Sequence, residues 1–173
     1  MKEIRWHARA GQGAKTAAQL YATALLRTGA SVQAFPEYGP ERRGAPLRAY
    51  TRIDERPIRR HDAIDSPDVV VVLEPSLVRE VDVADGLAPG GVVLVNAESP
   101  PDELEGVEVR CVPADRLAAS PKLANLVLVG ALAAALEAPV EEVVRAAIEL
   151  LGRKVSPGEI RSAVEEGHAW LSS

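Results

Sequence analysis

The chain has 173 residues, of which 47% are hydrophobic, 25 are acidic and 20 are basic, giving a formal net charge of −5. This length suffices for one domain with a true hydrophobic core. The single cysteine, Cys111, excludes an internal disulfide and an iron–sulfur cluster or Cys-rich zinc site held by this chain alone. The acidic balance argues against general nucleic-acid binding, which normally requires a basic face.

The N-terminus and the hydrophobic runs favour a cytoplasmic protein. Charged residues begin the chain and lead straight into a strand pattern, so we expect no secretory signal. The longest apolar run, residues 126–136, has 11 residues, whereas a membrane span needs about 20. We therefore expect neither nucleic acid nor a membrane as a partner.

The first third of the chain alternates strand and helix patterns. Alternating side chains indicate strands, and apolar residues at helical spacing followed by Gly29 indicate a helix with its C-terminal cap. In chain order we expect a strand over 2–7, a helix over 14–27, a strand over 31–35, a loop over 36–46 and a strand over 47–53.

The rest of the chain continues the alternation. Four valines and a leucine at 69–73 indicate a strand buried on both faces, as in a parallel sheet. Further on we expect a helix over 75–84, strands over 92–95 and 107–112, and helices over 114–119, 123–136, 141–151 and 157–170. This order predicts an α/β protein, a three-layer α/β/α arrangement on a mostly parallel sheet, with 1–173 as a single domain.

The turn between the first strand and the first helix is rich in small residues. It reads Ala-Arg-Ala-Gly-Gln-Gly-Ala-Lys-Thr over 8–16. Ligands of open α/β sheets bind at the carboxyl ends of strands, and a helix N-terminus there attracts anions. The turn matches neither a P-loop nor a dinucleotide fingerprint, because Ala14 separates Gly13 from Lys15 and Thr16 stands where the third glycine belongs. A tight turn that binds nothing is an equally weighted alternative.

The loop over 38–46 reads Tyr-Gly-Pro-Glu-Arg-Arg-Gly-Ala-Pro. Adjacent arginines between rigid glycines and prolines indicate a preorganised recognition loop, because the guanidinium fork fits carboxylates and phosphates. A partner chain is as suitable a target as a small anion, since Arg and Tyr are enriched at interfaces. A solvated connector is the plainer alternative.

Other chemistry-bearing residues give weaker signals. Asn125 lies in an otherwise apolar helix, where its amide needs a partner, and a core hydrogen bond is the simpler explanation. His7, His61 and His168 are far apart in the sequence, and Cys111 lies in a predicted strand. We therefore expect no catalytic residue and no metal ligand in this chain.

Two of these segments resemble a known family. The turn over 8–13 resembles the G-R-G-G-Q-G turn of the gamma subunit of the 2-oxoacid:ferredoxin oxidoreductases, which include the pyruvate, 2-ketoisovalerate and indolepyruvate enzymes. The segment 35–46 is similar to that family's second hallmark almost residue for residue, and the helix from Asn125 is similar to its third. Ala8 and Ala10 replace two glycines of the turn, which makes it less permissive of positive φ and puts any contact of those glycines in doubt.

The resemblance implies a subunit without chemistry of its own. The whole complex oxidatively decarboxylates a 2-oxoacid to an acyl-CoA and reduces ferredoxin, with thiamine diphosphate and [4Fe-4S] clusters on the alpha, beta and delta subunits. The gamma subunit would serve assembly and coenzyme A access. The expected contact residues for a ligand or partner are Arg9, Gly11, Gln12, Gly13, Tyr38, Gly39, Glu41, Arg42, Arg43, Gly44 and Asn125.

Two other functions remain open from the residues alone. Lys15 and Thr16 favour a stand-alone nucleotide- or phosphate-binding α/β module that uses the turn over 11–16. The other possibility is a structural partner domain whose loops bind nothing small.

Overall fold

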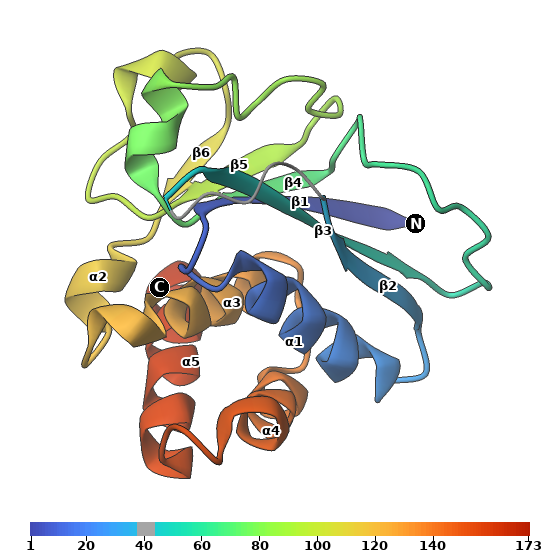
Figure 1. The fold of residues 1–173 in the computed structure, drawn as a ribbon, viewed down its shortest axis with the longest axis vertical. Helices are drawn as coiled ribbons and strands as arrows, with labels where there is room; N and C mark the ends of the chain where they lie inside the picture. The colour runs from blue at the N-terminus through green and yellow to red at the C-terminus, as the bar shows by residue number, and fades with distance from the viewer. Residues whose placement is uncertain (38–43) are drawn as a thin grey trace.

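The computed structural model describes residues 1–37 and 44–173. A six-stranded sheet with the order β2-β3-β1-β4-β5-β6 runs through its middle (Figure 1). Its strands are β1 (Lys2–Arg9), β2 (Ser31–Pro36), β3 (Pro46–Asp54), β4 (Val69–Val72), β5 (Val92–Val95) and β6 (Val109–Cys111).

Only one strand of this sheet runs against the others. β1, β4, β5 and β6 pair in parallel, whereas β3 is antiparallel to both β1 and β2. Five strands therefore point the same way, and their carboxyl ends meet at one edge of the sheet. The mostly parallel sheet that the buried valine runs predict is confirmed.

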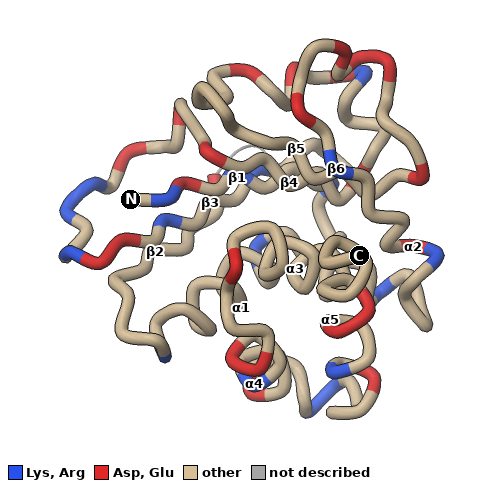
Figure 2. The backbone as a smooth tube through the Cα atoms, turned by 180° about the vertical axis from the view of Figure 1, so that it is seen from behind, with Lys and Arg blue, Asp and Glu red and all other residues tan. Residues whose placement is uncertain are grey.

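The long helices all cover one face of the sheet, as Figure 1 shows. They are α1 (Ala14–Leu26), α3 (Ala124–Ala135), α4 (Val140–Leu151) and α5 (Pro157–Ser172), and the short α2 (Ala114–Leu117) lies near the end of α5. α3 is buried along nearly its whole length and bears no charged residue, in contrast to α4 and α5 (Figure 2). The apolar side chains of α3 are kept from solvent because this helix lies in the interior, against α5 and α1.

The opposite face carries short 3₁₀ helices and loops instead of α-helices. η1 (Pro75–Arg79) and η2 (Asp102–Leu104) cover it, and η3 (Pro121–Leu123) leads into α3. The helix expected over 75–84 is thus wrong beyond Arg79. The buried Arg5 guanidinium donates to the carbonyls of Val83 and Asp85, which holds the chain there in a turned path. The α/β class is confirmed, with a thin layer on this second face.

The two faces of the central strands have different cores. Ile4, Trp6 and Val71 belong to the large cluster under the helices, whereas Val70 and Val72 belong to a smaller one under η1 and η2. This alternation follows from the period of two along a strand. The predicted double burial of the 69–73 run is confirmed, because Val69, Val70, Val71 and Val72 are all at most 2% exposed.

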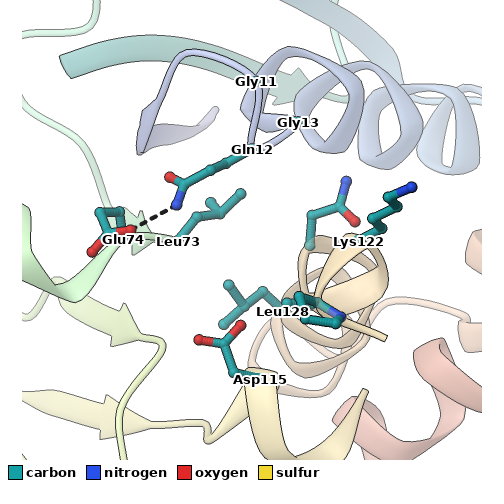
Figure 3. A pocket seen from close by; sticks show the side chains of 11 residues that line it. Gly11, Gln12, Gly13, Leu73, Glu74, Asp115, Lys122 and Leu128 are labelled. Atoms are coloured by element: carbon teal, nitrogen blue, oxygen red, sulfur yellow. Dashed lines mark hydrogen bonds between the residues drawn. The ribbon is translucent and has the colours of Figure 1, made fainter. Parts of the chain in front are cut away.

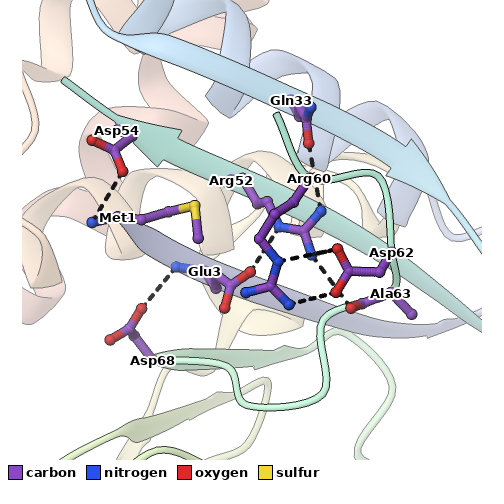
Figure 4. Close-up of polar contacts among 9 residues, drawn as sticks. All are labelled: Met1, Glu3, Gln33, Arg52, Asp54, Arg60, Asp62, Ala63 and Asp68. Carbon is purple, nitrogen blue, oxygen red and sulfur yellow. Dashed lines mark hydrogen bonds and ion pairs between the residues drawn. The ribbon is translucent and has the colours of Figure 1, made fainter. Parts of the chain in front are cut away.

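A polar network replaces hydrophobic packing on the second face of β1 and β3 (Figure 4). The Arg52 side chain is fully buried, and its Nε donates to Glu3 Oε1 at 2.7 Å. Its Nη2 donates to the carbonyl of Ala63 at 3.3 Å and lies 3.5 Å from Asp62. These contacts fasten the connection between β3 and β4 onto the sheet.

Candidate functional site

The turn at the carboxyl end of β1 obtains its shape from two glycines. Gly11 and Gly13 have φ values of 100° and 85°, which side-chain-bearing residues rarely adopt. Glu137 is the one non-glycine residue with positive φ in the described part of the chain. Ala8 and Ala10 therefore need no positive φ, and their replacement of glycine leaves the backbone path of the turn available.

The first turn of α1 has no side-chain cap. Gly13 occupies the N-cap position in the left-handed region and offers no side chain to the free N–H groups behind it. α5, by contrast, begins with a complete capping box between Ser156 and Glu159. The α1 N-terminus thus keeps donors and a partial positive charge directed at the carboxyl edge of the sheet.

Arg9 joins the glycine-rich turn to two other segments. Its guanidinium donates to Ser76 Oγ at 2.9 Å and to the carbonyl of Gly44 at 3.1 Å, and it forms an ion pair with Glu80. The hydrogen bond to Glu80 raises the pKa of Arg9. Arg9 therefore orders the end of the 38–46 loop and η1 around the turn.

Gln12 closes the turn and also reaches across to the end of β4. Its Oε1 accepts from the backbone N–H of Arg9 at 2.7 Å, and its Nε2 donates to Glu74 Oε2 at 2.7 Å. Burial opposes ionisation of Glu74, but hydrogen bonds from Ser76 and Gln12 outweigh it and lower the pKa of the carboxyl group. Glu74 is consequently an anion beside the turn at neutral pH.

A cavity of about 350 Å³ lies between this turn and the start of α3 (Figure 3). Glu74 and Asp115 line one side, and the Lys122 ammonium points away from them on the other. The remaining lining comes from Gly11, Gln12, Gly13, Leu73, Pro121, Ala124, Asn125 and Leu128. The cavity therefore offers both acidic acceptors and a cationic rim with free backbone donors.

Asn125 is the buried polar residue of this cavity. It is 9% exposed, and its Oδ1 has no hydrogen-bond partner within the described residues. A Cβ on residue 13 would lie 2.6 Å from Asn125 Nδ2, so the amide packs closely on the turn only because Gly13 has no side chain. An unpaired buried amide is costly, and a bound group that pairs with it would remove that cost.

Asp115 is held in the cavity wall by Asn96, which follows β5. Asn96 Nδ2 donates to Asp115 Oδ2 at 3.0 Å and to the carbonyl of Leu73 at 3.1 Å. Asn96 Oδ1 accepts from the backbone N–H of Asp115 at 3.3 Å. The acidic side of the cavity is therefore built from Glu74 at the end of β4 and from Asp115 of α2, which Asn96 at the end of β5 holds in place.

The structure brings together four of the residues selected from the sequence. Gly11, Gln12, Gly13 and Asn125 line the cavity, while Arg9 and the carbonyl of Gly44 lie at the side of the turn. Tyr38, Gly39, Glu41, Arg42 and Arg43 lie outside the described residues.

Sequence reasoning missed Glu74, Asp115 and Lys122. The first of these follows β4 after Leu73, where the carboxyl-end rule for parallel strands could have found it. Asp115 and Lys122 gave no such signal, because Asp115 lies in the short helix α2 and Lys122 in η3, and neither directly follows a strand.

The comparison with protein families settles the relationship. The model of the family described as pyruvate ferredoxin/flavodoxin oxidoreductase matches residues 3–168. The chain belongs to this family. The resemblance seen in the turn and in the 35–46 segment is thereby confirmed.

Members of the oxidoreductase family with assigned roles are similar over different shares of their length. The pyruvate/ketoisovalerate oxidoreductases common subunit gamma of Thermococcus kodakarensis is 57% identical over 104 residues, 60% of this chain and 56% of that protein. Pyruvate synthase subunit PorC of Methanosarcina barkeri is 42% identical over 141 residues, 78% of each chain. The crystal structure of the pyruvate oxidoreductase subunit PORC from Thermotoga maritima is 33% identical, with a TM-score of 0.83 over 97% of this chain and 95% of that one.

The described residues of the chain hold neither a membrane-spanning helix nor a metal-binding cluster. None of its helices there is both long and apolar enough to cross a membrane. Over residues 1–37 and 44–173, no three His, Cys, Asp or Glu side chains form a group that could hold a metal ion.

Proposed function

We propose that this chain is the gamma subunit of a 2-oxoacid:ferredoxin oxidoreductase complex, with residues 1–173 acting as one gamma-type domain. The observation that carries the proposal is the family match over 3–168. In this complex the chain supports assembly with alpha, beta and delta subunits, and it contributes to coenzyme A access. Ferredoxin is reached through the complex, and the setting is the cytoplasm.

The residues of the chain fit a subunit that leaves the redox groups to its partners. A [4Fe-4S] cluster takes four thiolates, and the chain has one cysteine. That cysteine, Cys111, lies at the β6 edge, and burial raises the pKa of its thiol, which disfavours the thiolate. Thiamine diphosphate and the clusters therefore belong on the other subunits in this proposal.

The cavity beside Gly13 is the part of the chain that we assign to coenzyme A. Free donors of the α1 N-terminus and the Lys122 ammonium suit a phosphate of that molecule, and the unpaired acceptor Asn125 Oδ1 suits the N–H of one of its amide groups. The cavity, at about 350 Å³, holds only part of so large a ligand. The rest of coenzyme A would lie on partner subunits.

The experiment is co-expression of this chain, tagged, with the neighbouring oxidoreductase subunits. We expect the other subunits to co-purify, and we expect the chain alone to be colourless and inactive with pyruvate, coenzyme A and ferredoxin. A chain that forms no complex, or a brown single chain that is active alone, overturns the proposal.

The role of the segment around Arg42 and Arg43 is inferred from the sequence alone, so it needs a separate test. We propose that these arginines bind a partner subunit or the diphosphate of coenzyme A. Loss of an Arg buried at an interface typically costs about 2–4 kcal/mol of binding. Replacing both by Ala should weaken assembly or raise the KM for coenzyme A, and unchanged assembly and kinetics would leave the segment a connector.

The uncapped N-terminus of α1, with its free backbone donors, also favours a second candidate function, phosphate binding independent of any complex. Titration of the isolated chain with ADP and with inorganic phosphate separates the two. Micromolar binding without partner subunits supports the stand-alone module, and its absence favours a site completed by the complex.

A further inference from the structure

β2 ends the sheet and leaves a row of backbone groups without a partner among the residues that the structure describes. The N–H of Glu37 donates to the carbonyl of Arg48, and bonding positions alternate along antiparallel strands. The odd-numbered residues of β2 therefore bond to β3, and Val32, Ala34 and Pro36 direct their backbone groups outward. The outer edge offers two N–H groups, of Val32 and Ala34, and the ring of Pro36 stands where a third would be.

Apart from Pro36 at its end, this edge lacks the devices that normally protect an edge strand. Such strands are usually blunted by charged side chains, bulges or covering elements. No residue from Ser31 to Pro36 is charged, and the pairing with β3 is continuous. Its six residues are long enough to accept another strand.

The opposite edge strand of the sheet, β6, is protected. β6 has three residues, and the indole of Trp170 donates to the carbonyl of Cys111 at 2.9 Å. The guanidinium of Arg116 lies over the Trp170 ring, 5.3 Å from its centre, and bonds to Glu98. One edge of the sheet is thus covered by the chain itself, whereas no residue of 1–37 or 44–173 pairs with the outer edge of β2.

A groove of about 600 Å³ accompanies the open edge. It is lined by β2, by Tyr50 of β3, and by His61 and Ala63 of the following loop. Phe35 and Tyr50 form its aromatic floor, with ring centres 5.2 Å apart. The one carboxylate in the lining, Glu37, already accepts from the Tyr50 hydroxyl and pairs with Arg48. The groove therefore suits an uncharged, apolar side chain.

A second copy of this chain would not fill the groove. Two β2 strands can pair antiparallel with Pro36 outside the ladder when Val32 of one copy lies opposite Ala34 of the other. Odd-numbered residues then share a face, so that Ser31 and Gln33 of the second copy would lie beside Phe35. These are small or polar side chains on an aromatic floor, and the match is poor.

We propose that the outer edge of β2 pairs with an extended, uncharged segment of another subunit of the complex, which inserts one apolar side chain between Phe35, Tyr50 and Ala63. The mode is strand addition, in which the backbone provides hydrogen bonds and the groove provides selectivity. The segment is short, because Pro36 ends the ladder after two donors. This inference rests on the proposed function for the existence of the partner, and on the edge and groove for its location.

Amide hydrogen exchange at single-residue resolution on the purified complex and on the free chain tests it. In the free chain, the inward amides of Gln33 and Phe35 exchange slowly, and the outward amides of Val32 and Ala34 exchange fast. In the complex, we expect the amides of Val32 and Ala34 to exchange at least about tenfold more slowly than in the free chain. The exchange rates of Gln33 and Phe35 should change little. An intact complex with unchanged Val32 and Ala34 overturns the inference but leaves the proposed function standing. Protection that rises with the concentration of the free chain also overturns it, in favour of self-pairing.

Two variants give an independent readout by assembly. Ala34→Pro removes an outward donor without removing a bond to β3, and Ala63→Gln fills the groove from an exposed position. Each should weaken recovery of the complex about tenfold while the free chain keeps its melting temperature. Ala169→Gln, the same change at an exposed alanine on α5, should have no effect. If both β2-groove variants assemble as well as Ala169→Gln, the edge is not the contact.

Discussion

Gly130 on α3 and Gly167 on α5 allow these two helices to touch backbone to backbone. A Cβ at Gly130 would overlap the carbonyl oxygen of Val164, and a Cβ at Gly167 would overlap that of Val127. Each glycine packs on the backbone of the opposite helix. A Cβ added at either position would therefore force α3 and α5 apart and break the contact of the other glycine as well. This approach fixes the charge-free α3 under the sheet, and with it the position of Asn125 in the cavity.

The helix contact predicts that Gly130→Ala and Gly167→Ala each destabilise the chain. Overpacking of this kind costs about 1–3 kcal/mol. Gly158→Ala is the matched control, because Gly158 lies in the first turn of α5 with open space around it. It should stabilise the chain by about 0.5–1 kcal/mol, as Ala is the better helix former. Urea unfolding of the three variants measures this, and equal effects would contradict the packing argument.

Arg52 should be far more important for stability than its surface neighbour Arg60. Both arginines pair with Asp62, but Arg52 is fully buried and also binds Glu3, whose side chain is 13% exposed. Arg52→Met leaves Glu3 without its partner, and breaking such a buried pair costs about 3–5 kcal/mol. Arg60→Met removes an exposed pair and should cost at most about 1 kcal/mol. The difference in free energy of unfolding between the two variants is the test.

His7 should make the fold sensitive to mild acid. Burial, with the nearby charges of Arg5 and Arg48, lowers the pKa of His7 to about 3. The unfolded chain takes up this proton near pH 6.5 and the folded chain does not, so stability is full above that pH and declines as pH falls toward 3. The slope is about 1.4 kcal/mol per pH unit for this residue.

The His7→Gln variant isolates that contribution. Gln keeps an acceptor for Arg5, whose Nε lies 3.2 Å from His7 Nε2, but it cannot titrate. Unfolding free energies between pH 6.5 and 5 should lose this slope in His7→Gln and keep it in His61→Gln, where the histidine is exposed. A slope that persists in His7→Gln would assign the acid sensitivity to other groups.

The cavity predicts a variant that is more stable and less functional. Asn125→Leu removes an unpaired buried polar group, which should be neutral or stabilising by about 1 kcal/mol. In the reconstituted complex, it should raise the KM for coenzyme A. If KM stays the same while stability rises, Asn125 is a core residue and the cavity does not take the ligand.

Gly13→Ala should disturb the same cavity through Asn125. Gly29→Ala controls for backbone strain, because Gly29 has a similar φ of 93° but no atom within 4 Å of a Cβ. Both variants should lose similar stability from the positive φ, and only Gly13→Ala should alter the coenzyme A dependence. Equal kinetics in the two would contradict the role of this cavity.

Local sequence patterns predict much of the fold. The valine runs at 69–73 and 92–95 reveal buried parallel strands, and glycines 11 and 13 reveal a turn with positive φ. The expected helix over 75–84 failed beyond Arg79 because Arg5, about 80 residues away, takes the carbonyls of Val83 and Asp85. The site shows the same division. The turn is visible in the sequence, and Glu74 lies where a parallel strand ends. That these two meet Asp115 at one cavity follows from the order of the strands, which no local pattern specifies.

Stepwise reconstitution tests the gamma-subunit assignment most directly. The other subunits, purified without this chain, are titrated with it while coenzyme A-dependent reduction of ferredoxin by pyruvate and by 2-ketoisovalerate is followed. We predict that activity with one of these 2-oxoacids rises with added chain and saturates at a fixed molar ratio. Full activity before the chain is added, or no response at any ratio with a folded chain, would contradict the assignment.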